Sequence, residues 1–166
     1  MKKIVLGVIL GFSLSSCNQN DPTDPVKEPE KIKFSGILIR DERGLPLNPV
    51  DPDDWNIKDT WVEQEMSLFG NNLKTDCAAP GYEIIAYPNP VLNKSFIAVY
   101  KPDSVQYAIR IVDKDFKVLF KKDSIKTKAI LIDYASFGIK DTVRVYYKFI
   151  NGGCEFRGHG DVVIRK

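Results

Sequence analysis

The sequence is poor in the features that several common protein classes need. It has one histidine, three cysteines and, with 24 Lys+Arg against 22 Asp+Glu, a formal charge of only +2 over 166 residues. One histidine cannot supply the several ligands of a histidine-rich metal site. A nearly neutral chain without a long basic run gives little support to nucleic-acid binding. No apolar run reaches the roughly 20 residues of a membrane-spanning helix, and the length fits one domain with an appendage.

The one clearly apolar stretch lies at the N-terminus and is typical of an export signal. Two lysines precede the apolar residues 4–14, which are too few to span a membrane and fit the core of a secretory signal. The following residues, Leu14-Ser15-Ser16-Cys17, resemble the bacterial lipobox. The resemblance implies cleavage after residue 16 and lipidation of the Cys17 thiol. We therefore expect residues 1–16 to be a lipoprotein signal peptide; a simple secretory signal with a chance cysteine is the alternative.

Residues 17–33 are expected to form a disordered tether between the membrane and the domain. They include three prolines and many charged side chains, and they have too little apolar surface to offset the entropy lost on ordering. Asn18 follows Cys17, whereas an aspartate there resembles an inner-membrane retention signal of enteric bacteria. The sequence therefore favours a lipid anchor in the outer membrane of the cell envelope and leaves open whether the protein faces the periplasm or the cell surface.

Residues 34–80 are expected to form a strand, a loop and one short helix that pack on the following domain. The strand is predicted over residues 34–40, and the proline-rich residues 45–54 are predicted to be a loop. Thr60 and Glu63 have the spacing of a capping box at the start of a helix. The helix is expected to present one apolar stripe, formed by Val62, Met66 and Phe69, to an edge or end of a sheet. It is expected to end at Gly70.

From residue 81 to residue 166 the pattern predicts a β-sandwich. Apolar and polar side chains alternate along successive short segments, which is typical of a sheet with one wetted face. Short strands without intervening helices favour an antiparallel two-sheet sandwich. The expected fold class is therefore mostly β, an antiparallel sandwich of about seven strands with one short N-terminal helix. The strands are predicted at residues 82–87, 95–101, 106–113, 117–121, 129–134, 142–150 and 154–165.

The same region resembles a known family. The motif Tyr87-Pro88-Asn89-Pro90 and the segment 109–119 are similar to the C-terminal sorting domain of type IX secretion cargo in Bacteroidota, over about residues 86–166. The resemblance implies an Ig-like sandwich and makes secretion sorting an alternative function. Phe116 stands where that family has glycine. As a whole, the chain also resembles the small lipoproteins of gut Bacteroidota.

Two cysteines remain once Cys17 is assigned to lipid. Export would place Cys77 and Cys154 in an oxidising compartment, where a pair of cysteines is a candidate disulfide. The bridge would close a loop of about 78 residues, which the chain-entropy model values at about 4–5 kcal/mol. It would tie the junction between helix and sandwich to the last hairpin. Two separate free thiols are the alternative.

His159 is the first candidate for chemistry. It is followed closely by Asp161, and Ser124 and Ser136 are available elsewhere in the chain, so a Ser-His-Asp arrangement is conceivable. The sequence has no Gly-x-Ser-x-Gly elbow to support it. The glycines on both sides of His159 more often mark a bulge or a turn. We therefore predict no catalytic residue.

An acidic loop is a weak second candidate. Asp51, Asp53 and Asp54 provide the oxygen ligands that Ca²⁺ prefers. The loop lacks the glycine and the distal glutamate of an EF-hand, and Asp54 fits equally well as the cap of a local turn. No metal and no cofactor are predicted; a metal-dependent or hydrolytic site near this loop and His159 is kept as an alternative.

The last candidate is an aromatic residue between two cations. Along the strand 142–150, Arg144, Tyr146 and Lys148 point away from the core set of Val143, Val145, Tyr147 and Phe149. An exposed Tyr146 ring beside two cations is suited to contact a glycan or a protein, and His159 is a further candidate binding residue. The alternative is a ring that lies flat on the sheet. The sequence therefore favours a non-enzymatic, lipid-anchored envelope protein that binds a protein or glycan partner and no nucleic acid.

Overall fold

The computed structural model describes residues 28–58, 60–70, 77–78 and 81–165. The predicted signal peptide, the lipidation site Cys17 and the first part of the tether lie outside the described residues. No helix among the residues described is long and apolar enough to cross a membrane.

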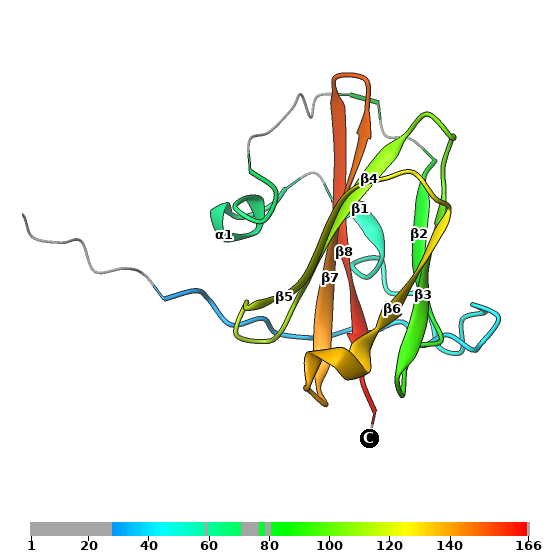
Figure 1. Ribbon diagram of the computed structural model, residues 1–166, viewed down its shortest axis with the longest axis vertical. Coiled ribbons are helices and arrows are strands. Elements are labelled where there is room, and N and C mark those ends of the chain that lie inside the picture. The colour runs from blue at the N-terminus through cyan, green and yellow to red at the C-terminus, as the bar shows by residue number, and fades with distance from the viewer. Residues whose placement is uncertain (1–27, 59, 71–76, 79–80, 166) are drawn as a thin grey trace, which may run out of the picture.

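Two antiparallel sheets lie face to face (Figure 1). The larger sheet has the strand order β1-β8-β7-β4-β5, and the smaller has the order β2-β3-β6. The prediction of a mostly β fold, consistent with a sandwich and carrying one short helix, is confirmed. The strands are β1 (Asn56–Lys58), β2 (Glu83–Tyr87), β3 (Lys94–Tyr100), β4 (Gln106–Val112), β5 (Val118–Ile125), β6 (Ala129–Asp133), β7 (Thr142–Asn151) and β8 (Cys154–Val163).

The structure differs from the predicted strands at two places near the N-terminal end of the domain. The three-residue β1 was not predicted, because it is too short to show a period of two. The strand predicted over residues 34–40 is absent; the described backbone there makes only isolated bridges at Arg40. Gly36 interrupts the extended backbone with φ +65°. The amides of Leu38 and Ile39 donate to side-chain oxygens of Asp54 and Asn48 instead of to a strand.

The predicted helix forms, but it is shorter and begins later. Helix α1 covers Glu63–Met66. The capping carboxylate belongs to Glu65, whose Oε2 accepts from the Val62 amide at 3.0 Å, so the prediction of a Thr60–Glu63 box is wrong. The physical reason lies in Trp61, whose ring packs edge-on against Tyr146 at 5.5 Å and keeps the chain extended across the sheet up to Val62. The helix ends at Met66 with Ser67 as its C-cap, so the prediction that Gly70 closes it is wrong; Gly70, with φ +71°, ends the turns that follow.

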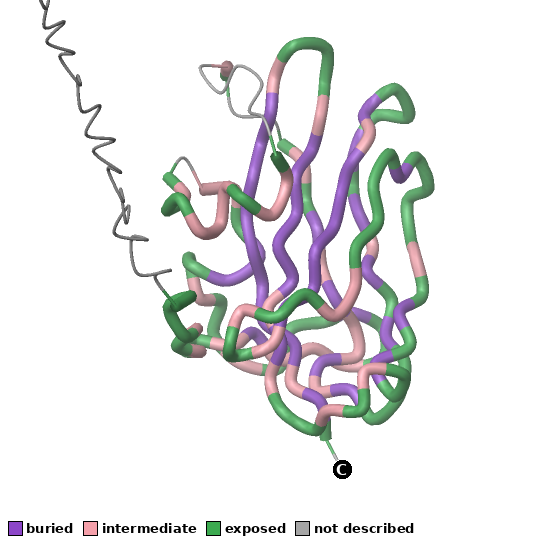
Figure 2. Tube along the Cα trace, turned by 60° about the vertical axis from the view of Figure 1, so that its left-hand side comes forward, coloured by how far each residue is buried: buried purple, intermediate pink, exposed green. Residues whose placement is uncertain are grey.

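The core lies between the two sheets. Figure 2 shows the buried backbone concentrated along the central strands, with exposed loops at their ends. The large sheet contributes alternate residues of β4 and β7, and the inward orientation predicted for Val143, Val145, Tyr147 and Phe149 is confirmed. The small sheet contributes alternate residues of its three strands to the same cluster: Ile84, Ala86, Ile97, Val99 and Ile132.

Two glycines of β8 make room for an aromatic stack in this core. The Trp55 and Tyr147 rings are parallel within 4°, with centroids 6.3 Å apart. A Cβ atom at Gly160 would collide with the Trp55 ring, and one at Gly158 would collide with Tyr147. The prediction that these glycines mark a bulge or turn is therefore wrong: they lie within a regular strand and allow close approach of large rings.

The cysteine pair forms the predicted bridge. A disulfide joins Cys77 to Cys154, with the Cα atoms 6.1 Å apart, across a sequence separation of 77 residues. Cys154 is the first residue of β8. The bridge therefore fastens the segment that follows α1 to the β7–β8 hairpin.

Candidate functional site

The residues predicted to form an exposed binding face lie under another part of the chain. Arg144, Tyr146 and Lys148 are on the outer face of the large sheet, as the alternation predicts. Residues 60–70, here called the strap, pass over this face. The Tyr146 side chain is only 1% exposed, so the expectation of an exposed ring is wrong. Alternation along a strand identifies two faces, but it does not reveal that a distant segment covers one of them.

The strap holds Tyr146 by its hydroxyl and by its ring. The hydroxyl donates to Glu65 Oε1 at 2.9 Å. Its ring also meets Phe116 from the β4–β5 turn and His159 from β8, with centroids 5.8 and 5.7 Å away. Burial, reinforced by the Glu65 charge, raises the pKa of Tyr146 well above its usual value. At neutral pH it is an uncharged packing residue.

Cations on the same face are covered by aromatic rings of the strap. The Arg110 guanidinium lies 4.8 Å from the Phe69 ring centroid, and the Lys148 ammonium lies 5.5 Å from the same centroid. Arg157 lies 5.6 Å from the Trp61 ring. Such contacts are attractive because the ring face carries negative charge density. Of the two cations that the sequence offers for an external ligand, Lys148 lies against the strap and pairs with Glu155 at 2.6 Å, and Arg144 pairs with Asp161 at 2.7 Å.

His159 is buried beside Tyr146 and has no catalytic geometry. Burial, with repulsion from the Arg144 and Lys58 charges, lowers the pKa of His159 to about 3. Among the described residues, its Nδ1 has no hydrogen-bond partner. The Asp161 carboxylate is engaged by Arg144 at 2.7 and 2.8 Å, and Ser136 donates to the Asp133 carbonyl. In the described part of the chain, the structure does not bring Ser136, His159 and Asp161 into hydrogen-bonded contact.

The acidic loop is used for structure. The buried Asp54 carboxylate accepts from the amides of Leu38 and Asp161 at 2.7 and 2.8 Å. Burial raises the pKa of Asp54 to about 6, although these two bonds favour its charged form. Asp53 pairs with Lys58 at 3.3 Å. Across the ranges that the structure describes, no group of three or more His, Cys, Asp or Glu side chains is arranged to hold a metal ion.

Asn89, which is fully buried, uses its side chain to connect three distant parts of the backbone. Its Nδ2 donates to the carbonyls of Leu38 and Asp161 at 2.8 and 2.9 Å. Its Oδ1 accepts from the Val163 amide at 2.9 Å. In the sequence, its signal is an asparagine between two prolines, Pro88 and Pro90, within the motif of the sorting-domain resemblance.

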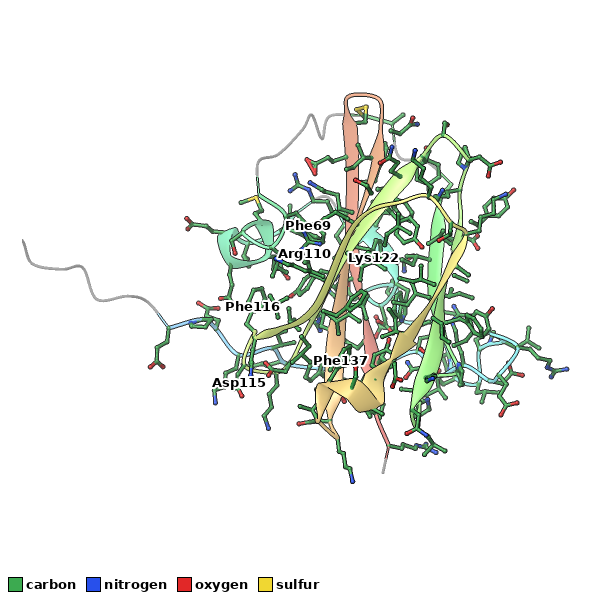
Figure 3. The ribbon with its side chains drawn as sticks, in the orientation of Figure 1. Phe69, Arg110, Asp115, Phe116, Lys122 and Phe137 are labelled. Carbon is green, nitrogen blue, oxygen red and sulfur yellow. A yellow bond between two sulfur atoms is a disulfide. The ribbon has the colours of Figure 1, made fainter. Side chains whose placement is uncertain are left out.

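A groove of about 700 Å³ lies where the strap meets the β4–β5 hairpin. Figure 3 shows Phe69, Arg110 and Phe116 grouped in the space between α1 and β5. The Arg110 guanidinium donates to the Leu68 carbonyl at 2.9 Å and to Asp123 Oδ1 at 2.7 Å. Arg110 therefore fastens the strap to the sheet. The groove is lined by Ser67, Leu68, Arg110, Phe116, Val118, Leu119, Phe120 and Lys121.

The outer face of the small sheet is the better candidate for contact with a partner. It lies on the side of the molecule away from α1 (Figure 1). Its side chains include large exposed rings and aliphatic groups: Tyr100 is 76% exposed, Leu131 53% and Phe96 44%. We call this surface the open face. Its residues are Glu83, Ile85, Tyr87, Phe96, Ala98, Tyr100, Ala129 and Leu131.

Strand register arranges the open face into rows across the sheet. Tyr87, Phe96 and Leu131 form one row, and Ile85, Ala98 and Ala129 form the next. Glu83 lies opposite Tyr100 beyond them. Because Ala98 has a small side chain, the surface dips beside Tyr100, between β2 and β3. A depression of about 200 Å³ is found there, lined by Glu83, Ile84, Ile85, Ala98, Val99 and Tyr100.

The borders of the open face carry both signs of charge. Lys94 and Asp133 pair at 3.6 Å beside the first row. At the β2 side, the Glu83 charge lies within electrostatic reach of Arg40. Burial lowers the pKa of Arg40, and the negative charges of Asp54 and Glu83 act in the opposite direction. The face therefore combines exposed aromatic surface, a shallow depression and balanced polar groups.

The sequence was also compared with known proteins. No protein-family model matches the chain, and no curated protein matches it. A function for the protein is therefore inferred from its own sequence and structure.

Proposed function

We propose that the protein is a non-enzymatic module of the bacterial cell envelope, anchored by lipid at Cys17 and binding a partner through the open face. The observation that carries the proposal is the order of parts along the chain. An export signal with a lipobox comes first, a tether follows, and the disulfide-braced β domain comes last. Several acyl chains hold a protein durably on a bilayer, since each buried CH₂ contributes about 0.8 kcal/mol.

The contrast between the two outer sheet faces supports the choice of surface. On the large sheet, the strap covers the charged face and its aromatic rings take up the cations. On the small sheet, Phe96 and Leu131 are exposed side by side, and Tyr100 is exposed two rows away on the same face. Contiguous exposed apolar surface of this kind is typical of interaction sites.

Secretion sorting is a second candidate function, favoured by the motif Tyr87-Pro88-Asn89-Pro90 and by the Ig-like sandwich that the resemblance implies. Deleting residues 87–166 and following the remaining chain tests it. A sorting role predicts that the truncated chain stays in the periplasm while the full chain leaves it. An envelope-binding role predicts that both chains stay with the membrane fraction, since both keep Cys17.

The anchor is tested by labelling cells that express the full chain with radioactive palmitate. The wild-type chain is expected to carry label and to sediment with the outer membrane. Cys17→Ala is expected to lose the label, whereas Cys77→Ala, compared per amount of protein, keeps it. An unlabelled wild-type chain in the soluble fraction would overturn the anchoring half of the proposal.

The surface is tested by placing a photo-crosslinking benzophenone side chain at position 131, on the open face, and at position 62, on the strap. Leu131 and Val62 are both aliphatic, and they are 53% and 64% exposed, so the two probes are matched in access to solvent. Illumination of living cells is expected to give an adduct from position 131 and none from position 62. Equal adducts from both positions, or none from either, would contradict binding through the open face.

A further inference from the structure

We infer that the open face binds a neutral glycan of a few sugar units, with one sugar ring seated in the depression beside Tyr100 that Glu83, Ile85 and Ala98 also line. The inference rests on the proposed function, because it names the class of partner for the same surface.

The surface is too small for a standard protein partner. Its three strands have five, seven and five residues. At strand spacings of about 4.8 Å and a rise of about 3.3 Å per residue, the face is about 14 Å wide and about 23 Å long, roughly 300 Å². Stable protein interfaces bury about 800 Å² on each partner. A ligand of two or three sugar rings matches the smaller area.

The chemistry of the face matches the two sides of a sugar ring. A pyranose has an apolar face of C–H groups and a rim of hydroxyl groups. The Tyr100 ring, 76% exposed, and the Phe96 ring, 44% exposed and two rows away on the same face, offer aromatic surface to the C–H groups. Ala98 lowers the floor of the depression, so that a sugar ring can descend beside Tyr100.

Polar groups at the border suit the hydroxyl rim. The Glu83 carboxylate, opposite Tyr100 in the strand register, accepts hydrogen bonds from hydroxyl donors, and hydrogen bonds to charged acceptors are stronger than neutral ones. The Tyr100 hydroxyl both donates and accepts. These groups give orientation to a ligand that the rings alone would hold without regard to direction.

The charge of the face favours an uncharged ligand. Lys94 and Asp133 neutralise one another on one side, and on the other side Glu83 lies within electrostatic reach of Arg40. A strongly anionic polymer or a basic peptide would therefore meet no field of opposite sign to steer it.

The test is electrophoresis of the full-length chain, extracted in mild detergent, through native gels that contain a soluble polysaccharide. The neutral probes are β-glucan, α-mannan, xylan and galactan, and the anionic probe is polygalacturonate. Wild type is expected to be retarded in at least one neutral gel and not in the anionic gel. Tyr100→Ala is expected to bind that polysaccharide about tenfold more weakly, a loss comparable to that of one aromatic contact.

The control variant is Val62→Ala, which removes an equally exposed apolar group from the strap and is expected to migrate as wild type does. Glu83→Gln is expected to weaken binding by a smaller factor, because the amide keeps one acceptor. Because the Tyr100 and Glu83 side chains are exposed, both variants should retain the urea unfolding midpoint of wild type.

Absence of retardation in every neutral gel, or equal retardation of wild type and Tyr100→Ala, would overturn the inference. If sedimentation shows that wild type is a dimer and that Tyr100→Ala is a monomer, the open face binds a second copy of the chain, and the glycan inference is overturned. If the chain carries palmitate but is not retarded in any neutral gel, the glycan inference is wrong and the proposal of an anchored module stands. If the chain is retarded but carries no palmitate, the anchoring proposal is wrong and the glycan inference stands.

Discussion

Asn89 shows how one buried side chain connects parts of the chain that are far apart in sequence. It joins the segment at Leu38 to the end of β8 through three hydrogen bonds. Asp54 makes a parallel connection between Leu38 and Asp161. Because buried polar groups cost free energy when they lack partners, these two side chains fix where the N-terminal segment lies on the sandwich.

Replacing Asn89 with alanine is expected to lower the free energy of unfolding by about 2–4 kcal/mol, because two carbonyls and one amide lose their partner inside the protein. Asn93→Ala is the control, since that side chain is exposed and its loss is expected to cost less than about 0.5 kcal/mol. Urea unfolding of the two variants and wild type measures the difference. Equal midpoints for Asn89→Ala and wild type would contradict the structural role.

His159 and Asp54 are expected to give the protein opposite responses to acid. The pKa of His159 is lowered to about 3 in the folded state, against about 6.5 in an unfolded chain. Its contribution to stability is therefore complete above about pH 6.5 and is lost as the pH falls. The pKa of Asp54 is raised to about 6, against about 3.9 unfolded, so its contribution is complete below about pH 4 and is lost as the pH rises.

The test compares urea unfolding at about pH 7 and about pH 4.5. Relative to wild type, His159→Asn is expected to gain about 2 kcal/mol on acidification, and Asp54→Asn is expected to lose about as much. The two effects largely cancel in wild type. Shifts of the same sign in both variants, or no dependence on pH in either, would contradict the assignment of these burial effects.

The strands were predictable because a sheet with one buried face imposes an alternation that the sequence displays directly. The strap was not. Its stripe of Val62, Met66 and Phe69 predicted a continuous helix with those residues inward, yet Val62 is 64% exposed and α1 has only four residues. The strap packs on a charged surface, so its contacts are made by rings over cations and by Glu65 on Tyr146, which a search for apolar periodicity does not detect.

Trp61→Ala is expected to destabilise the protein by about 2–3 kcal/mol, through lost burial of the ring and lost contacts to Tyr146 and Arg157. Partial loosening of the strap should also make residues 60–70 easier to cleave. Limited proteolysis with mass spectrometry of the fragments measures this. Val62→Ala, next in the chain and exposed, is the control; equal cleavage of both variants and wild type would show that Trp61 does not hold the strap.

The candidate site illustrates a limit of reasoning from one sequence. Alternation correctly placed Arg144, Tyr146 and Lys148 on an outer face, but the outer face with large exposed side chains is the one formed by β2, β3 and β6. Gly44 lies against that face at Ile85 and Tyr87. Which of two faces a strap covers depends on contacts between residues about 80 positions apart, such as Glu65 with Tyr146. The exposed rings at positions 96 and 100 alternate in the sequence just as core residues do, so only the fold distinguishes them.

The Cys77–Cys154 bridge acts on the molecule as a whole, because it links the chain beyond the strap to the β7–β8 hairpin across 77 positions. Reduction, or the double substitution Cys77→Ala with Cys154→Ala, is expected to lower the free energy of unfolding by about 4 kcal/mol, since the unfolded chain regains the freedom that the closed loop had removed. Urea unfolding with and without dithiothreitol measures it. Cys17→Ala leaves the bridge in place and should unfold as wild type does; a wild-type midpoint that dithiothreitol does not move would show that strap and sheet are held by their side-chain contacts alone.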